Sequence, residues 1–336
     1  MRRQIRFVIP AERAGGALLD FLTTRFTYHT RDEWLDRLTE GRMTCNGRPT
    51  PPEHLLQTGD ELAYDPGGLA EPPMDDRIGV VHADADLLVI DKTGNLTCHP
   101  CGRYFNHTLW AILKTRHGIE NPIFVNRIDR ETSGLVLVAR TPSAAKNLRA
   151  QFAGRTVDKQ YLALVEGAFP ERATAAGWIV ADFTGEVLKQ RRFLPVTTAA
   201  GHWVTAPASA VPPGPEAQWG WTEFALLERH GDLSLISAAP HTGRLHQIRV
   251  TLQTLGYPLV GDKLYGLDPG FFLRFCQDAL TAGDFARMRM KRQALHAAGL
   301  RFRHPATGQE LSFALPLPAD MQAVLGGSGA RQFCMG

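Results

Sequence analysis

The sequence has few cysteines and no long apolar run. Its 336 residues include only five cysteines, an odd number scattered along the chain at Cys45, Cys98, Cys101, Cys276 and Cys334. That pattern does not suggest a disulfide framework, and it fits a reducing cytosol. No window approaches the roughly 18 to 20 apolar residues of a membrane-spanning helix, and no apolar run follows the charges of the N-terminal MRRQIRFVIP. The sequence therefore predicts a soluble cytoplasmic protein without a membrane partner.

An excess of one charge sign is also lacking. Lys and Arg total 37, Asp and Glu total 34, and the formal net charge is +3. This is weak evidence for a polyanionic partner, because it is the local clustering of Lys and Arg that builds a binding face. The clustered run ARMRMKR at 286–292 is either an RNA-phosphate contact or a solvated helix face.

A second Cys-x-x-Cys pair is missing as well. Cys98 and Cys101, with His99 and His107 nearby, form the one such pair in the sequence. A structural zinc site needs four ligands, usually supplied by two such pairs, so we predict no metal site. No repeat of roughly 20 to 50 residues is evident, which excludes a solenoid or a propeller.

The chain length and one stretch rich in Pro and Gly predict two domains. At 336 residues the chain exceeds what one compact core usually holds, so a main domain with a smaller one is expected. The segment DPGGLAEPP at 65–73 has the composition of a linker. We predict a small module at 1–64, a linker at 65–76, a larger domain at 77–325 and a flexible tail at 326–336.

The small module has the pattern of two helices followed by short strands. Apolar spacing predicts helices over 17–26 and 31–40, and Gly41 is a typical helix stop. Met43 to Cys45 is typical of a strand that enters a tight Asn46-Gly47 turn, and a further strand is expected from Glu61 to Tyr64.

Beyond residue 77 the pattern changes to many short apolar runs separated by Gly, Pro and Asn. A few helical patterns interrupt them, for example over 143–152 and 245–255. This mixture favours the α+β class with a largely antiparallel sheet.

The segment NRIDRETSGLVLVAR at 126–140 inserts charged residues between two apolar runs, at 123–125 and 135–138. Such runs are typical of buried strands, so the charged residues are expected on a loop at the rim of a sheet. Asp129 is flanked there by Arg127 and Arg130, which would keep its carboxylate ionised. It would then be able to act as a nucleophile or a base. The alternative is a solvated charged turn.

This segment resembles the motif HRLDxxTSGLLLLA of pseudouridine synthases of the RluA/RluD type. The matching positions are Arg127, Asp129, Thr132, Ser133, Gly134, Leu135, Leu137 and Ala139. The resemblance implies that Asp129 is the essential catalytic residue. Asn126 departs from the motif, which has a histidine at that position.

Two further segments resemble motifs of the same family. Lys92 lies in DKTGNL, which is similar to an early motif, although Thr93 replaces its proline; Lys92 would meet a phosphate, hold the catalytic loop or extend its stem past apolar surface as a strand-end lysine. In VDKQYLALVEG the pair Lys159 and Tyr161 opens a strand. The resemblance puts Tyr161 at the position of an active-site tyrosine that stacks on an extruded uracil, whereas a core tyrosine is the alternative.

The segment HTGRLHQIR at 241–249 resembles TGRxHQIRVHL, with Thr251 in place of the motif's second histidine. Thr242-Gly243 is a turn signal before an amphipathic helix, which would direct Arg244. The resemblance makes Arg249 the partner of Asp129, and a guanidinium so placed lowers the pKa of a carboxylate. His246 and Gln247 are expected to orient the loop rather than to catalyse.

The small module resembles the RNA-binding module named after ribosomal small-subunit protein four. That resemblance puts the basic side chains of its second helix and flank against RNA, at Arg31, Arg37, Arg42 and Arg48. Taken singly, each is equally explained as a solvated surface charge.

Together these resemblances imply an α+β catalytic domain with a mostly antiparallel mixed sheet, preceded by a small α/β RNA-binding domain. The implied activity is isomerisation of uridine to pseudouridine in structured RNA by base flipping, without a metal or organic cofactor. Asp129 would either attack C1′ or assist loss of a sugar proton, and Arg127 would occupy the space of the flipped base.

Contacts to RNA would come from Lys92, Lys159, Arg244 and the arginines of the small module. Ribosomal RNA is favoured, transfer RNA is the other substrate considered, and a monomer is expected. The departures at Asn126, Thr93 and Thr251 keep open an RNA-binding assembly factor whose catalysis has been lost. A metal-dependent hydrolase that uses Asp129 with histidines is a weaker alternative.

Overall fold

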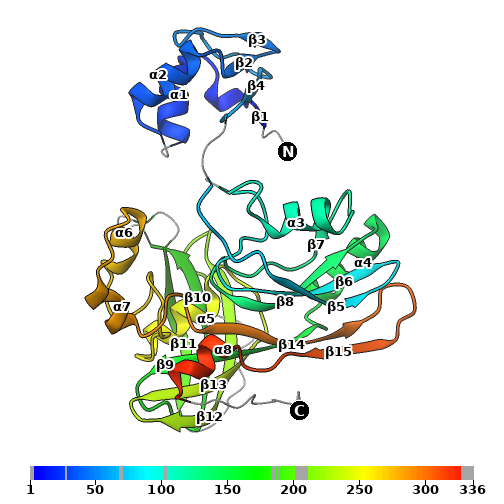
Figure 1. Ribbon diagram of the computed structural model, residues 1–336, viewed down its shortest axis with the longest axis vertical. Helices are drawn as coiled ribbons and strands as arrows, with labels where there is room; N and C mark the ends of the chain where they lie inside the picture. Colours follow the sequence, from blue (N-terminus) through cyan, green and yellow to red (C-terminus); the bar gives the residue numbers. More distant parts are fainter. Residues whose placement is uncertain are drawn as a thin grey trace. The chain divides into compact units, whose positions relative to one another are not determined.

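The computed structural model describes residues 4–26, 29–67, 71–101, 104–182, 187, 190–200 and 211–326. Within these residues no helix is both long and apolar enough to cross a membrane. Figure 1 shows the course of the chain. The chain divides into two compact units: Met1–Pro73 with His99–Ala111, and Met74–Cys98 with Ile112–Gly336. The division after Pro73 falls inside the predicted linker. Residues 327–336, most of the predicted tail, lie outside the described part of the chain, as does Cys334.

The segment His99–Ala111 groups with the smaller unit, whereas the sequence-based boundaries put it in the larger domain. In this segment the backbone N–H groups of Phe105, Asn106 and His107 donate to the carboxylate of Glu71, each at 2.7 Å. Three such bonds to one carboxylate hold this loop against residues of the linker.

The smaller unit is a four-stranded antiparallel sheet covered by two helices. Its strands follow the spatial order β1 (Ile5–Val8), β4 (Glu61–Tyr64), β2 (Met43–Cys45), β3 (Arg48–Pro49). The two α-helices are α1 (Leu18–Arg25) and α2 (Arg31–Thr39), and a short 3-10 helix, η1 (Ala11–Arg13), precedes them. Both predicted helices are confirmed within one residue at each end. Asn46 and Gly47 adopt positive φ of 51° and 76°, as the predicted two-residue turn requires.

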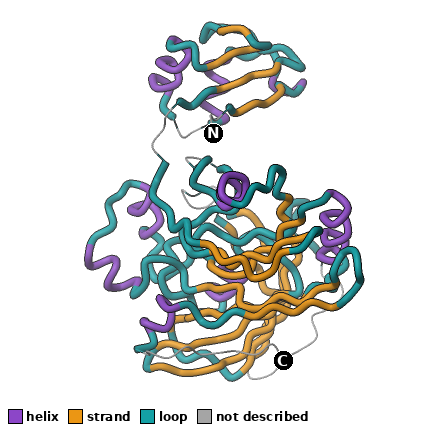
Figure 2. The backbone as a smooth tube through the Cα atoms, turned by 45° about the vertical axis from the view of Figure 1, so that its right-hand side comes forward, coloured by secondary structure: helices purple, strands orange, loops and turns teal. Residues whose placement is uncertain are grey.

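The larger unit is built on an eleven-stranded sheet in the order β11-β10-β12-β13-β9-β14-β8-β6-β5, with β15 beside β14 and β7 beside β8. The pairing of β14 with β8 is parallel, and the other pairings between the described strands are antiparallel. Figure 2 shows these long strands with the helices lying outside them. The predicted α+β class with a largely antiparallel sheet is therefore confirmed.

The strands of this sheet are β5 (Ile78–Ala83), β6 (Leu87–Lys92), β7 (Ile123–Phe124), β8 (Ser133–Ala139), β9 (Asp158–Glu166), β10 (Arg172–Ala181), β11 (Arg191–Ala200), β12 (Gln218–His230), β13 (Leu233–Pro240), β14 (Leu295–Arg303) and β15 (Glu310–Ala314). The remaining helices are α3 (Leu109–Arg116), α4 (Pro142–Ala153), α5 (Gln247–Thr254), α6 (Phe271–Cys276), α7 (Ala282–Met288) and α8 (Ala319–Val324).

Two helices bury their apolar faces against different parts of this sheet. Leu148 of α4 belongs to a cluster with Leu137 of β8, and Val250 of α5 belongs to a cluster with Ala163 of β9. α5 begins two residues later than predicted, because His246 before it adopts a left-handed conformation.

The middle strands of the sheet meet closely where β8 begins. Gly134 has a φ of 108°, and a Cβ at this position would lie 2.3 Å from the carbonyl oxygen of Ala297 on β14. A glycine is therefore required there. The loop before β8 therefore ends where β8 and β14 are in close contact.

Candidate active site

The loop between β7 and β8 carries Asp129 and is anchored to β8 at its first residue. The backbone N–H of Val125 donates to Leu137 O at 3.0 Å, and the side-chain oxygen of Asn126 accepts Leu137 N–H at 2.7 Å. At the other end, Thr132 N–H donates to Asp129 O at 3.2 Å. Asn126 thus supplies an acceptor that continues the hydrogen-bond ladder to β8 after β7 has ended. This contact gives a structural role to the residue that stands where the family motif has a histidine.

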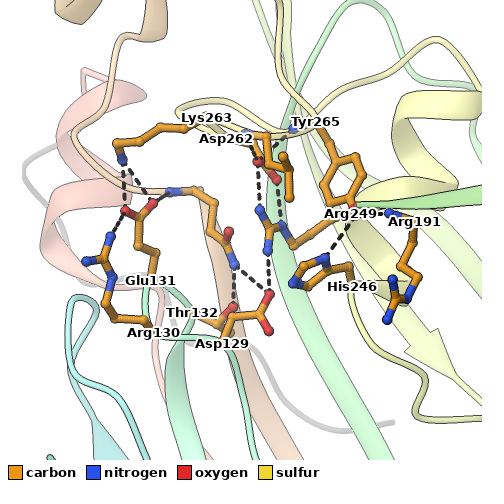
Figure 3. A network of polar contacts seen from close by, with 12 residues as sticks. Asp129, Arg130, Glu131, Thr132, Arg191, His246, Arg249, Asp262, Lys263 and Tyr265 are labelled. Carbon is orange, nitrogen blue, oxygen red and sulfur yellow. Dashed lines mark hydrogen bonds and ion pairs between the residues drawn. The ribbon is translucent and has the colours of Figure 1, made fainter. Parts of the chain in front are cut away.

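Asp129 lies against Arg249 of α5, as Figure 3 shows. Arg249 Nη1 donates to Asp129 Oδ2 at 2.7 Å. The side chain of Asp129 is 26% exposed, and none of the described residues donates to its second oxygen, Oδ1. One carboxylate oxygen is therefore held by the protein and the other is open to a substrate.

Asp262, which no motif or spacing in the sequence singles out, holds the other side of the Arg249 guanidinium. Its oxygens accept Nε at 2.7 Å and Nη2 at 2.9 Å, and its side chain is fully buried. Oδ1 also accepts the backbone N–H groups of Leu264 and Tyr265. A planar guanidinium gripped at two nitrogens cannot rotate, so its third nitrogen is aimed at Asp129.

These contacts determine the charge state of the site. Burial acts to raise the pKa of Asp129, but the positive charge of Arg249 and the hydrogen bonds from Arg249 and Gln293 act together against it, so this pKa lies below its usual value. The pKa of Asp262 is lowered in the same way, against its own burial. Both carboxylates are ionised at neutral pH around one shared cation.

The turn that follows Asp129 is clamped by residues distant in the sequence. Gln293 Nε2 donates to Thr132 Oγ1 at 2.6 Å and to Asp129 Oδ2 at 3.4 Å. The carboxylate of Glu131 accepts Lys263 Nζ at 2.9 and 3.0 Å. These buried contacts limit the movement of the Asp129 side chain.

Lys92 is buried and holds the same loop through hydrogen bonds to backbone carbonyls. This placement corrects its assignment to RNA binding. The side chain is fully buried, and Nζ donates to the carbonyl oxygens of Thr93, Leu96 and Arg130 at 2.7, 2.9 and 3.2 Å. Burial lowers the pKa of Lys92 to about 8. An amino group enclosed by three carbonyls cannot reach a phosphate, so the second role considered for Lys92 is the one that the structure supports.

His246 and Tyr265 line another side of the site. His246 Nδ1 lies 2.9 Å from the Tyr265 hydroxyl, and Arg191 N–H donates to that hydroxyl at 2.8 Å. Burial, followed by the charge of Arg249, lowers the pKa of His246 to about 4. The imidazole is therefore neutral at physiological pH.

Tyr161 lies on β9, where the predicted Lys-x-Tyr pair opens the strand. Its partly buried ring packs against the apolar cluster that includes α5. Burial, followed by the negative charge of Asp129, raises the pKa of Tyr161 to about 12. The phenol thus keeps its proton at neutral pH. It lies close enough to Asp129 for the charge of that carboxylate to act on its pKa.

Comparison with known proteins identifies this arrangement. Residues 86–254, half of the chain, match the family model described as RNA pseudouridylate synthase. This chain belongs to that family. An RNA pseudouridine synthase of Chlorobaculum parvum is 33% identical over 91% of each chain, and the ribosomal large subunit pseudouridine synthase D of Pseudomonas aeruginosa is 32% identical over 93% of this chain and 92% of its own. The protein is therefore an RNA-modifying isomerase.

A solved structure shows the same fold. The human RNA pseudouridylate synthase domain containing 1 superposes with a TM-score of 0.56 at 24% identity, covering 80% of this chain and 94% of its own. This likeness agrees with the α+β architecture of the larger unit.

Three further cations selected from the sequence of the synthase lie at or near its surface. Arg127 is exposed on the Asp129 loop, and Arg244 is exposed ahead of α5 with Nε donating to Trp219 O at 3.1 Å. Lys159 is half-buried and donates to Thr242 O at 3.1 Å. Burial, followed by the charge of Arg244, lowers the pKa of Lys159 to about 8.

The arginines selected in the small module of the synthase differ in their surroundings. Arg31 is exposed and paired with Asp20 at 3.0 Å, while Arg37 is half-buried, with Nε donating to the Tyr64 hydroxyl at 3.0 Å. Arg42 pairs with Glu40. Of these three arginines, Arg31 is the most exposed, and Arg37 has a structural contact to lose.

The basic run at 286–292 is engaged by carboxylates of the synthase itself. Arg287 contacts Asp268 at 3.3 Å, Arg289 is paired with Asp232, and Arg292 donates to Asp320 at 2.6 and 2.8 Å. Arg292 is 8% exposed. The buried Arg292 is therefore a poor candidate for an RNA contact, whereas the 57% exposure of Arg287 resembles that of Arg31.

Two groups of side chains in the described residues lie close enough to share a metal ion: Asp84, Asp86 and His304, and Cys45, His54 and Asp60. In the first, His304 Nδ1 accepts backbone N–H groups of Ala306 and Thr307. Its proton is therefore on Nε2, which contacts Asp84 at 3.1 Å and is not available to a metal. In the second, Asp60 accepts Asn46 Nδ2 and Gln57 N–H, both at 2.8 Å. Both groups have hydrogen-bonding roles.

Proposed function

We propose that the synthase converts uridines of ribosomal RNA to pseudouridine, with Asp129 acting at C1′ of the target nucleotide. The ribosomal assignment is supported by relatives named as ribosomal large subunit pseudouridine synthases. Two of them, D of Pseudomonas aeruginosa and C of Vibrio cholerae, align with 93% and 97% of this chain. Transfer RNA is the other substrate that a test must include.

The reaction needs a carboxylate at the sugar and a pocket that keeps the base. The N1–C1′ bond breaks, the base turns, and a C5–C1′ bond forms; C5 then loses its proton and N1 gains one. Asp129 either attacks C1′ and forms a transient ester, or assists loss of a sugar proton. Both routes need an ionised, oriented carboxylate with one accessible oxygen.

The observation that supports the proposal most directly is the hydrogen bond by which Arg249 holds the carboxylate of Asp129. Arg249 holds Oδ2 at 2.7 Å, while Oδ1 remains open to a substrate among the described residues. Arg249 is itself held by the buried Asp262, so the direction of the carboxylate is set before RNA binds. A solvated charged turn would not need this buried support.

Other residues of the larger unit would manage the flipped nucleotide. The protonated phenol of Tyr161 would stack on the uracil and donate a hydrogen bond. Arg127, exposed on the same loop as Asp129, would occupy the space that the base vacates in the RNA. Lys159 and Arg244 would contact phosphates next to the target.

In the test, purified synthase is incubated with total RNA from cells that lack its gene, and pseudouridines are mapped before and after. We expect new pseudouridine in ribosomal RNA, and none with Asp129→Asn. The matched control is Asp278→Asn, at an exposed aspartate of the same unit, which should retain activity. Modification confined to transfer RNA would overturn the ribosomal assignment, and an active Asp129→Asn variant would overturn the role of Asp129.

A further inference from the structure

His246 occupies a backbone conformation that is unusual for a residue with a side chain. Its φ of 57° and ψ of 16° lie in the left-handed region, immediately before α5. Non-glycine residues adopt this conformation in only a few per cent of cases, with Asn, Asp and His enriched. The conformation directs the imidazole between Tyr265 and the Asp129 side of the site, as Figure 3 shows.

The hydrogen bonds around Tyr265 decide which nitrogen of His246 carries the proton. Arg191 N–H can only donate, so the Tyr265 oxygen accepts it. Tyr265 is fully buried, and among the described residues His246 Nδ1 is the acceptor that remains for the phenol proton. Nδ1 therefore accepts. A neutral imidazole whose Nδ1 accepts carries its proton on Nε2.

This Nε2–H is a donor without an acceptor in the protein. None of the described residues accepts a hydrogen bond from it, although the ring lies close enough to Asp129 and Arg249 for both charges to act on its pKa. The hydrogen bond at Nδ1 orients the imidazole ring, and the Nε2–H is then left to donate to an acceptor atom of a ligand.

The chemistry of the reaction provides one acceptor before the base turns and another after it. In uridine the atom bonded to C1′ is N1, beside the C2=O2 carbonyl; in pseudouridine it is C5, beside the C4=O4 carbonyl. Turning the base thus replaces O2 by O4 at one point near C1′. Negative charge also spreads onto O2 as the N1–C1′ bond breaks, which strengthens a hydrogen bond there.

We propose that His246 donates its Nε2–H to the uracil of the flipped nucleotide, to O2 before the base turns and to O4 afterwards. This inference rests on the proposed role of Asp129 at C1′. It also provides specificity, since cytosine has an amino group at C4. That group would face the Nε2–H donor after the turn, leaving two donors without an acceptor.

The test separates the donor from the rest of the ring. His246→Asn keeps a residue suited to the left-handed backbone and an oxygen that can accept from Tyr265, but it lacks the Nε2–H. We expect kcat for pseudouridine formation to fall on the order of 10- to 100-fold, with the Kd for the same RNA unchanged. His246→Gln, whose amide can place a donor near the lost one, should recover part of the rate. His117→Asn, at an exposed histidine, is the control.

A substrate change makes the assignment specific to O2. A synthetic RNA with the mapped target uridine replaced by 2-thiouridine offers a weaker acceptor than O2. This replacement should slow the natural enzyme several-fold and affect His246→Asn much less. Equal slowing of both enzymes, or a full rate for His246→Asn, would overturn the proposal. Failure of the proposed function would be distinguished by an Asp129→Asn variant that still forms pseudouridine.

Discussion

The two units of the synthase differ in how deeply they bury pairs of arginine and aspartate. In the smaller unit the pair of Arg31 and Asp20 is 57% and 68% exposed, and the core is apolar around Trp34. In the larger unit the pair of Arg249 and Asp262 is 10% and 0% exposed. The larger unit therefore buries one pair of arginine and aspartate in its interior, in addition to exposed pairs such as Arg301 with Asp158.

This difference indicates where charge serves a purpose other than stability. Removing ions from water costs more than their attraction usually returns, so apolar residues would stabilise an interior at least as well. A buried network around Asp129 is expected only where a charge must be held in one direction. The pair of Arg31 and Asp20 in the smaller unit is exposed, so water screens its charges and the pair contributes little to stability.

The largest effect is expected from Arg249→Met, which removes the cation of the buried pair. It leaves the buried Asp262 without its cation, so we expect the free energy of unfolding to fall by about 3–5 kcal/mol and pseudouridine formation to be lost. The matched variant Arg31→Met in the smaller unit should cost about 0–1 kcal/mol. Urea unfolding of both full-length variants measures this. Equal losses would show that burial of the pair has no special consequence.

Lys92→Met removes a buried cation that makes no hydrogen bond to a carboxylate among the described residues. The pKa of Lys92 falls from 10.5 to about 8 on folding, so between these values the unfolded state binds more protons than the folded state. Stability contributed by this group therefore rises with pH across that window, by on the order of 3 kcal/mol. We expect natural enzyme to gain stability relative to Lys92→Met between pH 8 and 10. A difference that stays constant or narrows would contradict this placement.

The sequence was sufficient for the local features of the site. Asp129 was located on a loop because the apolar runs on both sides of it are typical of strands, and β7 and β8 occupy those positions. The resemblance of HTGRLHQIR to a known motif further paired Arg249 with Asp129, and the two side chains are in contact.

The supporting residues could not be predicted in the same way. Gln293 reaches Asp129 across 164 positions of the sequence, and no periodicity links two residues so far apart. Burial of Lys92 was equally hidden, since lysine is almost never fully buried and its spacing matches a strand end. Asp262 and Lys263 lie in the segment GDKLYG, where no spacing or charge pattern indicates a role for either side chain.

The smallest effect is expected at Lys159, which lies between the two extremes because it is half-buried and cationic. Its pKa of about 8 means that the ammonium group loses its charge as the pH rises from 7 to 9. RNA affinity should therefore weaken several-fold over this range, and the salt dependence of binding should decrease by about one phosphate contact. Lys159→Arg keeps the charge and should bind RNA equally at both pH values, as measured by titration at fixed salt. If the natural enzyme and this variant respond alike to pH, Lys159 does not contact phosphate.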